Sequence, residues 1–129
     1  MSFRLGKRSL RNMRGIHPDL SRVVKRAIAI SDQDFTVIEG LRTLARQKEL
    51  KRKGFSKTLR SRHITGHAVD IVPYPIAHRL DYPDSMWNEV SRAMKQAAKD
   101  LNVDLGWGPD MWNGWDKPHY QLQRKSYPA

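Results

Sequence analysis

A single carboxylate interrupts an otherwise apolar run in the middle of the chain, Ala68-Val69-Asp70-Ile71-Val72. The β-branched residues of this run, and the proline that follows at position 73, favour a strand. A charge buried in such a strand is costly unless a cation or hydrogen-bond donors compensate it. The fold must therefore bring a partner to Asp70. The two candidates are one of the chain's arginines and a metal ion.

The other hydrophobic patterns indicate helices and strands that are mixed without strict alternation. Apolar residues recur at helical spacing in three segments, and short β-branched or aromatic runs mark the strands. The predicted helices begin near Pro18, Leu44 and Ser85, and the predicted strands are 35–38, 68–72 and 118–122. This arrangement is typical of an α+β domain with a small, largely antiparallel sheet flanked by helices.

Length and composition indicate one folded domain. The chain has 129 residues, of which 39% are hydrophobic and 29% charged, a profile of globular rather than disordered proteins. We therefore expect a single domain over residues 1–129 that acts as a monomer. Residues 1–15 are basic and lack clear periodicity, so we expect them to form an extended or partly ordered arm.

The N-terminus lacks the apolar core of a signal peptide, and no segment approaches the length of a membrane span. We expect the protein to be made in the host cytoplasm without stable membrane insertion. A substrate outside the cytoplasm would then be reached only after another factor has permeabilised the membrane.

Because the chain contains no cysteine, a metal would have to be held by histidines and carboxylates. His63 lies a short loop upstream of Asp70, so both side chains can reach one site. His67 is a rival, but on a strand it falls on the opposite face from Asp70, and a helix joining it to His63 would run through Gly66. We therefore favour His63, with His119 as the third candidate. Two histidines and one aspartate with an open fourth position suit a catalytic zinc site.

Three ordered elements resemble the M15-type zinc peptidase family, which includes D-alanyl-D-alanine carboxypeptidases and phage L-alanyl-D-glutamate endolysins. The segment from Ser61 to Asp70 is similar to its signature Ser-x-His-x-x-Gly-x-Ala-x-Asp. The segment Asp116-Lys117-Pro118-His119 is similar to its second element, an acid shortly before the last zinc histidine. Glu39-Gly40-Leu41-Arg42-Thr43, with Gln47 beyond it, is similar to its arginine segment. The similarity spans about residues 16–122.

The resemblance implies the hedgehog/DD-peptidase fold and a Zn²⁺ ion on His63, Asp70 and His119. It also implies that Asp116 is the general base. Zinc can lower the pKa of a bound water to about 7. Asp116 would take the proton from that water, zinc and Arg42 would stabilise the oxyanion of the tetrahedral intermediate, and the protonated acid would then serve the leaving amine.

Further residues are expected at the substrate. The resemblance implies that Arg42 contacts the substrate carbonyl or a nearby carboxylate, that Gln47 belongs to the same binding segment, and that Ser61 faces the substrate or supports the ligands. Trp107, Trp112 and Trp115 lie close together amid glycines. We expect Trp115 in an aromatic wall of the substrate groove, and at least one of these tryptophans in the core.

The short chain, the absent leader and the first residues resemble the phage endolysin branch. We therefore expect hydrolysis of the L-alanyl–D-glutamate bond of the peptidoglycan stem peptide, leading to cell-wall lysis. A D-alanyl-D-alanine or L,D-carboxypeptidase is the alternative. The net charge of +11 raises a different alternative, a basic nucleic-acid-binding protein. That reading leaves Asp70 and the two histidine elements unexplained, so no nucleic-acid partner is expected.

Overall fold

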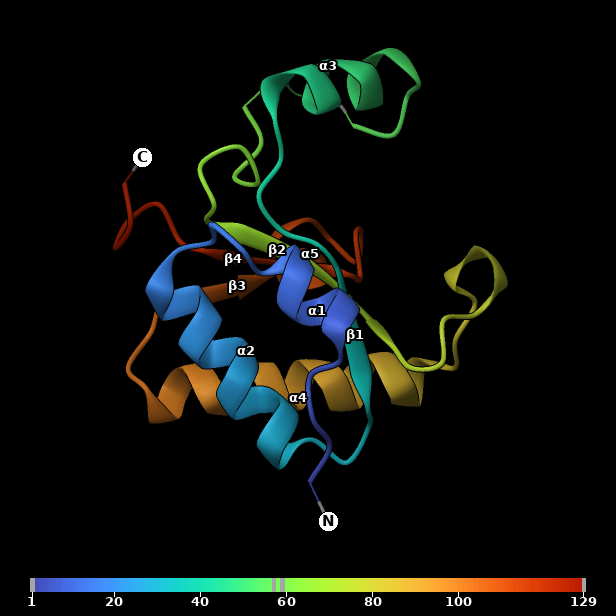
Figure 1. Cartoon of the computed structure of the whole chain (residues 1–129), viewed down its shortest axis with the longest axis vertical. Helices are drawn as coiled ribbons and strands as arrows, with labels where there is room; N and C mark the ends of the chain where they lie inside the picture. The colour runs from blue at the N-terminus through green and yellow to red at the C-terminus, as the bar shows by residue number, and fades with distance from the viewer. Residues whose placement is uncertain (1, 57, 59, 129) are drawn as a thin grey trace.

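The fold is built on four strands that pair in the order β1-β2-β4-β3, each neighbouring pair antiparallel (Figure 1). The strands are β1 (Phe35–Glu39), β2 (Ala68–Pro73), β3 (Leu105–Trp107) and β4 (His119–Leu122). The structure is a computed structural model that describes residues 2–56, 58 and 60–128. The α+β class and the small antiparallel sheet expected from the sequence are confirmed.

Two amphipathic helices, α2 (Pro18–Ile30) and α4 (Asp84–Asp100), pack against each other beside the sheet (Figure 1). Helix α2 begins at Pro18, and Nδ1 of His17 accepts a hydrogen bond from the backbone N–H of Asp19 at 3.0 Å, which satisfies one free donor of the first turn. The apolar stripes of both helices meet the sheet in one core. Burying each large aliphatic side chain there contributes about 1.5–3 kcal/mol.

Side-chain alternation in β2 and β4 separates the core from the candidate site. Val69 and Ile71 of β2, with Tyr120 and Leu122 of β4, belong to the core. Because successive side chains of a strand point to opposite faces, the residues between them face away from the helices. Asp70 and His119 are on that second face.

Within the N-terminal segment, expected above to be an extended or partly ordered arm, residues 7–12 form helix α1 (Lys7–Asn12). The helix docks on β1 through polar side chains. Ser9 Oγ accepts from the Val37 N–H at 3.0 Å, and Asn12 Nδ2 donates to the Val37 carbonyl at 2.8 Å. The helix thus satisfies backbone groups on the free edge of β1 while Leu10 stays exposed. This polar docking explains why hydrophobic periodicity did not indicate it.

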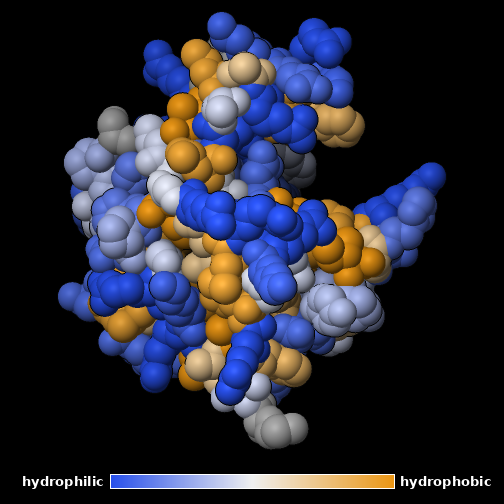
Figure 2. Space-filling model, viewed as in Figure 1, coloured by the Kyte–Doolittle hydropathy of each residue, from blue (hydrophilic) through white to orange (hydrophobic). Residues whose placement is uncertain are grey.

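The remaining elements lie around the second face of the sheet. They are α3 (Leu44–Arg52), α5 (Gly108–Met111) and a 3₁₀ turn at His78–Leu80. Helix α3 projects from the body, and the surface is indented between it and the protruding loop that carries the 3₁₀ turn (Figures 1 and 2). No helix among the described residues is long and apolar enough to cross a membrane.

Candidate active site

Strand pairing aligns three functional side chains in one row across the sheet. Asp70 lies opposite His119 of β4 on one side and opposite Glu39 of β1 on the other. Val37 pairs with Ile71, so two residues of β1 span one step of β2 and form a bulge. The bulge brings Glu39 onto the face of Asp70. Side chains in such a row lie within contact distance of one another.

His63 reaches this row from the loop that precedes β2. Its Nε2 lies 3.2 Å from Oδ1 of Asp70, and its Nδ1 lies 2.9 Å from the carbonyl oxygen of Gly40. Because a carbonyl only accepts hydrogen bonds, Nδ1 carries a proton, and Nε2 is the nitrogen turned toward Asp70.

His119 shows the same arrangement with its ring nitrogens exchanged. Its Nδ1 lies 3.4 Å from Oδ1 of Asp70, and its Nε2 donates to Oε1 of Gln121 at 2.9 Å. Gln121 follows two residues later on the same face of β4. Nδ1 is therefore the nitrogen turned toward Asp70, as Nε2 of His63 is.

This donor set fits a metal ion. One ligand atom each from His63, Asp70 and His119 lies within 4.8 Å of the other two, and hydrogen bonds to the remote nitrogens orient both rings, as is usual for metal-bound histidines. His67 does not join them. Its Nδ1 lies 2.7 Å from Thr65 Oγ1, and its ring packs beside His17 with centroids 5.5 Å apart.

The charges of the site shift its pKa values in opposite directions. Burial opposes ionisation of Asp70 most strongly, but His63 and His119 together outweigh it and hold the pKa of Asp70 well below its usual range. Burial, followed by the negative charge of Asp70, raises the pKa of Asp116. The two carboxylates are thus suited to different roles, one permanently ionised and one nearer to proton exchange.

Asp116 stands beside the donor set without belonging to it. Its Oδ2 lies 4.0 Å from Nδ1 of His119, and its backbone carbonyl accepts the His119 N–H at 3.1 Å. Its backbone has a φ of +67°, a conformation that Asp and Asn adopt more readily than other non-glycine residues. The turn directs the carboxylate into the cavity from the side of β4.

Arg42 lies behind Asp70, where other side chains hold its guanidinium. Glu39 accepts from its Nε at 2.8 Å and its Nη2 at 2.6 Å, and Gln47 Oε1 accepts from its Nη1 at 2.6 Å. Nη2 lies 3.8 Å from Oδ2 of Asp70, and Nη1 lies 3.5 Å from Ser61 Oγ. Arg42 and Ser61 both line the cavity.

Gln47 does not occupy the position expected of a substrate-binding residue. Its side chain is 0% exposed, and its amide also donates to Ser56 Oγ and the Thr58 carbonyl. A fully buried amide with these partners supports Arg42 and the following loop, and the expected substrate contact of Gln47 stays a prediction.

The cavity around these residues has a volume of about 760 Å³. Trp112 and Trp115 form part of its wall, and the Trp112 ring centroid lies 4.9 Å from that of His119. Phe55, at 73% exposed, lines it as well. Trp107 instead stacks on Tyr120 and packs against the core, which matches the expectation that one tryptophan is structural.

Comparison with known proteins identifies the family. The sequence model described as phage L-alanyl-D-glutamate peptidase matches residues 1–129. The chain belongs to the phage L-alanyl-D-glutamate peptidase family. The L-alanyl-D-glutamate peptidase of Escherichia phage T5 is 36% identical, over 98% of this chain and 94% of that protein. That of Listeria phage A118 is 28% identical, over 93% of this chain and 42% of that protein.

One solved structure agrees with this membership, and a second agrees in fold. The Serratia marcescens L-Ala D-Glu endopeptidase ChiX matches with a TM-score of 0.88 and 43% identity, over 99% of this peptidase and 96% of that chain. The vancomycin resistance D,D-dipeptidase VanXYg matches with a TM-score of 0.56 and 16% identity, over 83% of this peptidase and 50% of that chain. The second match supports the fold alone.

Sequence reasoning missed three supporting groups of the peptidase's site. The Gly40 carbonyl orients His63, Gln121 orients His119, and Glu39 holds Arg42. Gln121 had a recognisable signal, because a polar residue two positions after a ligand shares its face of a strand. The role of Glu39 depends on a bulge that no local pattern indicates.

Proposed function

We propose that this peptidase hydrolyses the L-Ala–D-Glu bond of the peptidoglycan stem peptide, with a zinc ion held by His63 Nε2, His119 Nδ1 and a carboxylate oxygen of Asp70. The observation that carries the proposal is the convergence of these three ligand atoms within 4.8 Å. Both histidines turn one ring nitrogen toward Asp70, where each would bind zinc in its unprotonated form, and a His₂Asp set leaves a coordination position open, as catalytic zinc sites do.

Zinc at this site would supply a Lewis acid and bring the pKa of a coordinated water to about 7. Asp116 is the general base of the proposed reaction. Its carboxylate stands beside His119 with a raised pKa, so it can accept a proton and return it to the nitrogen of the leaving amine.

The other cavity residues are assigned to positioning. Arg42 provides a fixed positive charge beside Asp70 for the substrate carbonyl or a nearby carboxylate, and Glu39 and Gln47 hold its orientation. Ser61 and Trp115 line the cavity and are assigned to substrate contact. We further propose that the peptidase acts as a monomer on the cell wall once the membrane has been permeabilised.

Metal analysis of the purified protein tests the zinc centre. We expect close to one zinc per chain, and strong loss of zinc on His63→Ala, Asp70→Ala or His119→Ala. His67→Ala is the matched control, because His67 lies outside the donor set. Stoichiometric zinc that survives all three ligand substitutions would refute the assignment, and loss on His67→Ala alone would place the metal elsewhere.

A further inference from the structure

One end of the cavity carries arginines whose charge is not neutralised. Arg60, Arg62 and Arg124 all line the cavity, and none forms an ion pair with any residue in 2–56, 58 or 60–128. Arg42 differs, because Glu39 binds its guanidinium through two hydrogen bonds. The positive field at this end of the cavity is therefore available to a ligand.

Arg62 is the buried member of this arginine cluster. Its side chain belongs to a residue only 4% exposed, and its Nη2 donates to the carbonyls of Leu122 at 2.7 Å and Tyr127 at 2.8 Å. Its Nε and Nη1 have no hydrogen-bond partner among the described residues. Burial, followed by the charge of Arg124, lowers the pKa of Arg62. A buried cation without a counter-charge is costly, and an anion bound nearby would offset that cost.

Arg60 and Arg124 are the exposed members, and they lie together. Nη2 of Arg124 donates to the carbonyl oxygen of Arg60 at 3.4 Å. Arg124 follows the end of β4, the strand that carries His119 and Gln121. The three arginines therefore line the part of the cavity that lies beyond His119 along β4. The exposed guanidinium groups of Arg60 and Arg124 are within reach of a ligand there.

We propose that Arg60, Arg62 and Arg124 form a carboxylate subsite for the part of the substrate on the D-Glu side of the scissile bond. This assignment rests on the proposed function. Glutamate has two carboxyl groups, so one stays free whichever of them continues the peptide. On the other side, the L-Ala carboxyl is consumed in the scissile bond and its side chain is a methyl group. Guanidinium groups bind carboxylates through charge-assisted, often paired hydrogen bonds, so the cluster orients the substrate with its D-Glu side toward Arg124.

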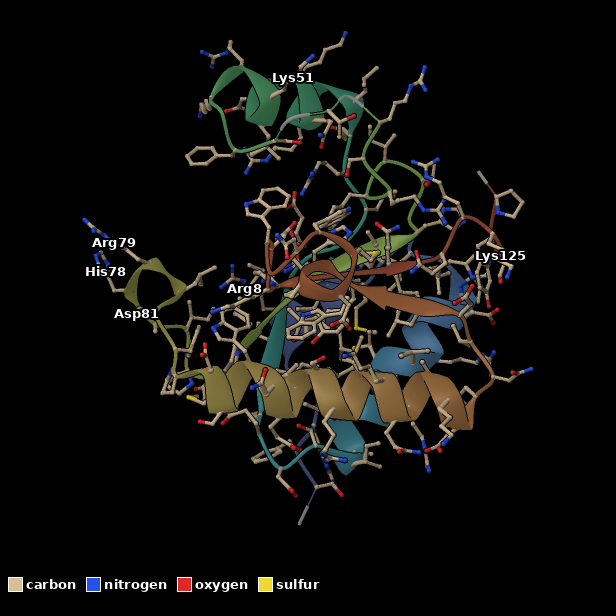
Figure 3. All side chains as sticks on the ribbon, turned by 180° about the vertical axis from the view of Figure 1, so that it is seen from behind. Arg8, Lys51, His78, Arg79, Asp81 and Lys125 are labelled. Atoms are coloured by element: carbon tan, nitrogen blue, oxygen red, sulfur yellow. The ribbon has the colours of Figure 1, made fainter. Side chains whose placement is uncertain are left out.

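The test compares three synthetic stem peptides with the zinc-loaded enzyme. The first is N-acetyl-L-Ala-γ-D-Glu-L-Lys-D-Ala, the second has the α-carboxyl of D-Glu amidated, and the third has the C-terminal carboxyl amidated. The variants are Arg60→Ala and Arg124→Ala, both at exposed positions. Lys125→Ala is the matched control, because this neighbouring exposed cation lies outside the cavity near the C-terminal end (Figure 3).

We expect Arg60→Ala and Arg124→Ala to lower kcat/KM on the first peptide by about tenfold, chiefly through KM. On the amidated peptide that lacks the bound carboxylate, the kcat/KM values of wild type and variants should differ by less than about threefold. The position of the amide in that peptide identifies the carboxylate that the arginines bind. Lys125→Ala should behave as wild type. Equal losses on all three peptides, or no loss on any, would overturn the subsite. A wild type that cleaves none of them would instead overturn the proposed function.

Discussion

The carbonyl oxygen of Gly40 lies 2.9 Å from Nδ1 of His63 and thereby turns Nε2 of that histidine toward Asp70. Gly40 itself is pressed against helix α1, where an added Cβ would overlap the carbonyl oxygen of Asn12 and touch Ile16. The N-terminal helix, which contributes no side chain to the donor set, thus fixes the position of one member of that set.

Gly40→Ala tests this connection. Relief of the overlap with Asn12 requires the backbone to shift, which would move the carbonyl away from His63. We expect weaker zinc binding in competition with a chelator and a lower Tm. Gly6→Ala is the control, since an added Cβ there meets nothing within 4 Å. Unchanged zinc affinity in Gly40→Ala would contradict the proposed role of α1.

Gln121→Leu tests the support of His119. Leucine has nearly the same volume but cannot accept the hydrogen bond from Nε2, so the ring would lose its fixed orientation and tautomer. Loss of such a supporting group typically lowers metal affinity by about 10–100-fold. Chelator competition measures this change, and Gln96→Leu, on the exposed side of α4, should leave the affinity unaltered.

Asp116→Asn separates proton transfer from metal binding. Asparagine also tolerates the positive φ at this position, so the fold and the zinc content should survive. Turnover should fall by about 10²–10⁴-fold, the usual contribution of a general base. The base acts only when deprotonated, and the pKa of Asp116 is raised. As the pH is lowered, wild-type activity should therefore begin to fall at a pH above the ordinary carboxyl range. This acidic limb of the pH–rate profile should change in the variant. A variant that loses its zinc would place Asp116 among the ligands.

Gln47→Leu tests the buried support of Arg42. The substitution leaves Nη1 of Arg42 without its 2.6 Å acceptor and removes the hydrogen bonds to Ser56 and Thr58. We expect destabilisation by about 1–3 kcal/mol, the usual cost of an unsatisfied buried polar group, measured by denaturant unfolding of the zinc-loaded protein. Lys48→Ala on the exposed face of α3 should change stability little. Equal stability of Gln47→Leu and wild type would contradict the role assigned to Gln47.

The donor set that the structure brings together could be predicted from a local signal at Asp70 and from the spacing and family resemblance of the two histidine elements. Asp70 interrupts an apolar strand, and His67 is excluded by strand alternation. The supporting contacts lacked such signals. Gln47 is a polar residue on a short helix with little apolar character, and it is buried only because Arg42 and the loop beyond it close around the amide. Helix α1 docks through Ser9 and Asn12, so hydrophobic periodicity could not reveal it.

Mass spectrometry of fragments released from purified peptidoglycan tests the central claim most directly. The zinc-loaded enzyme should release peptides that begin with D-Glu and leave L-Ala on the sugar-linked fragment. Chelation should abolish this release, and added zinc should restore it. Release of free D-Ala alone, or D-Glu-terminated fragments that persist after complete removal of zinc, would contradict the account.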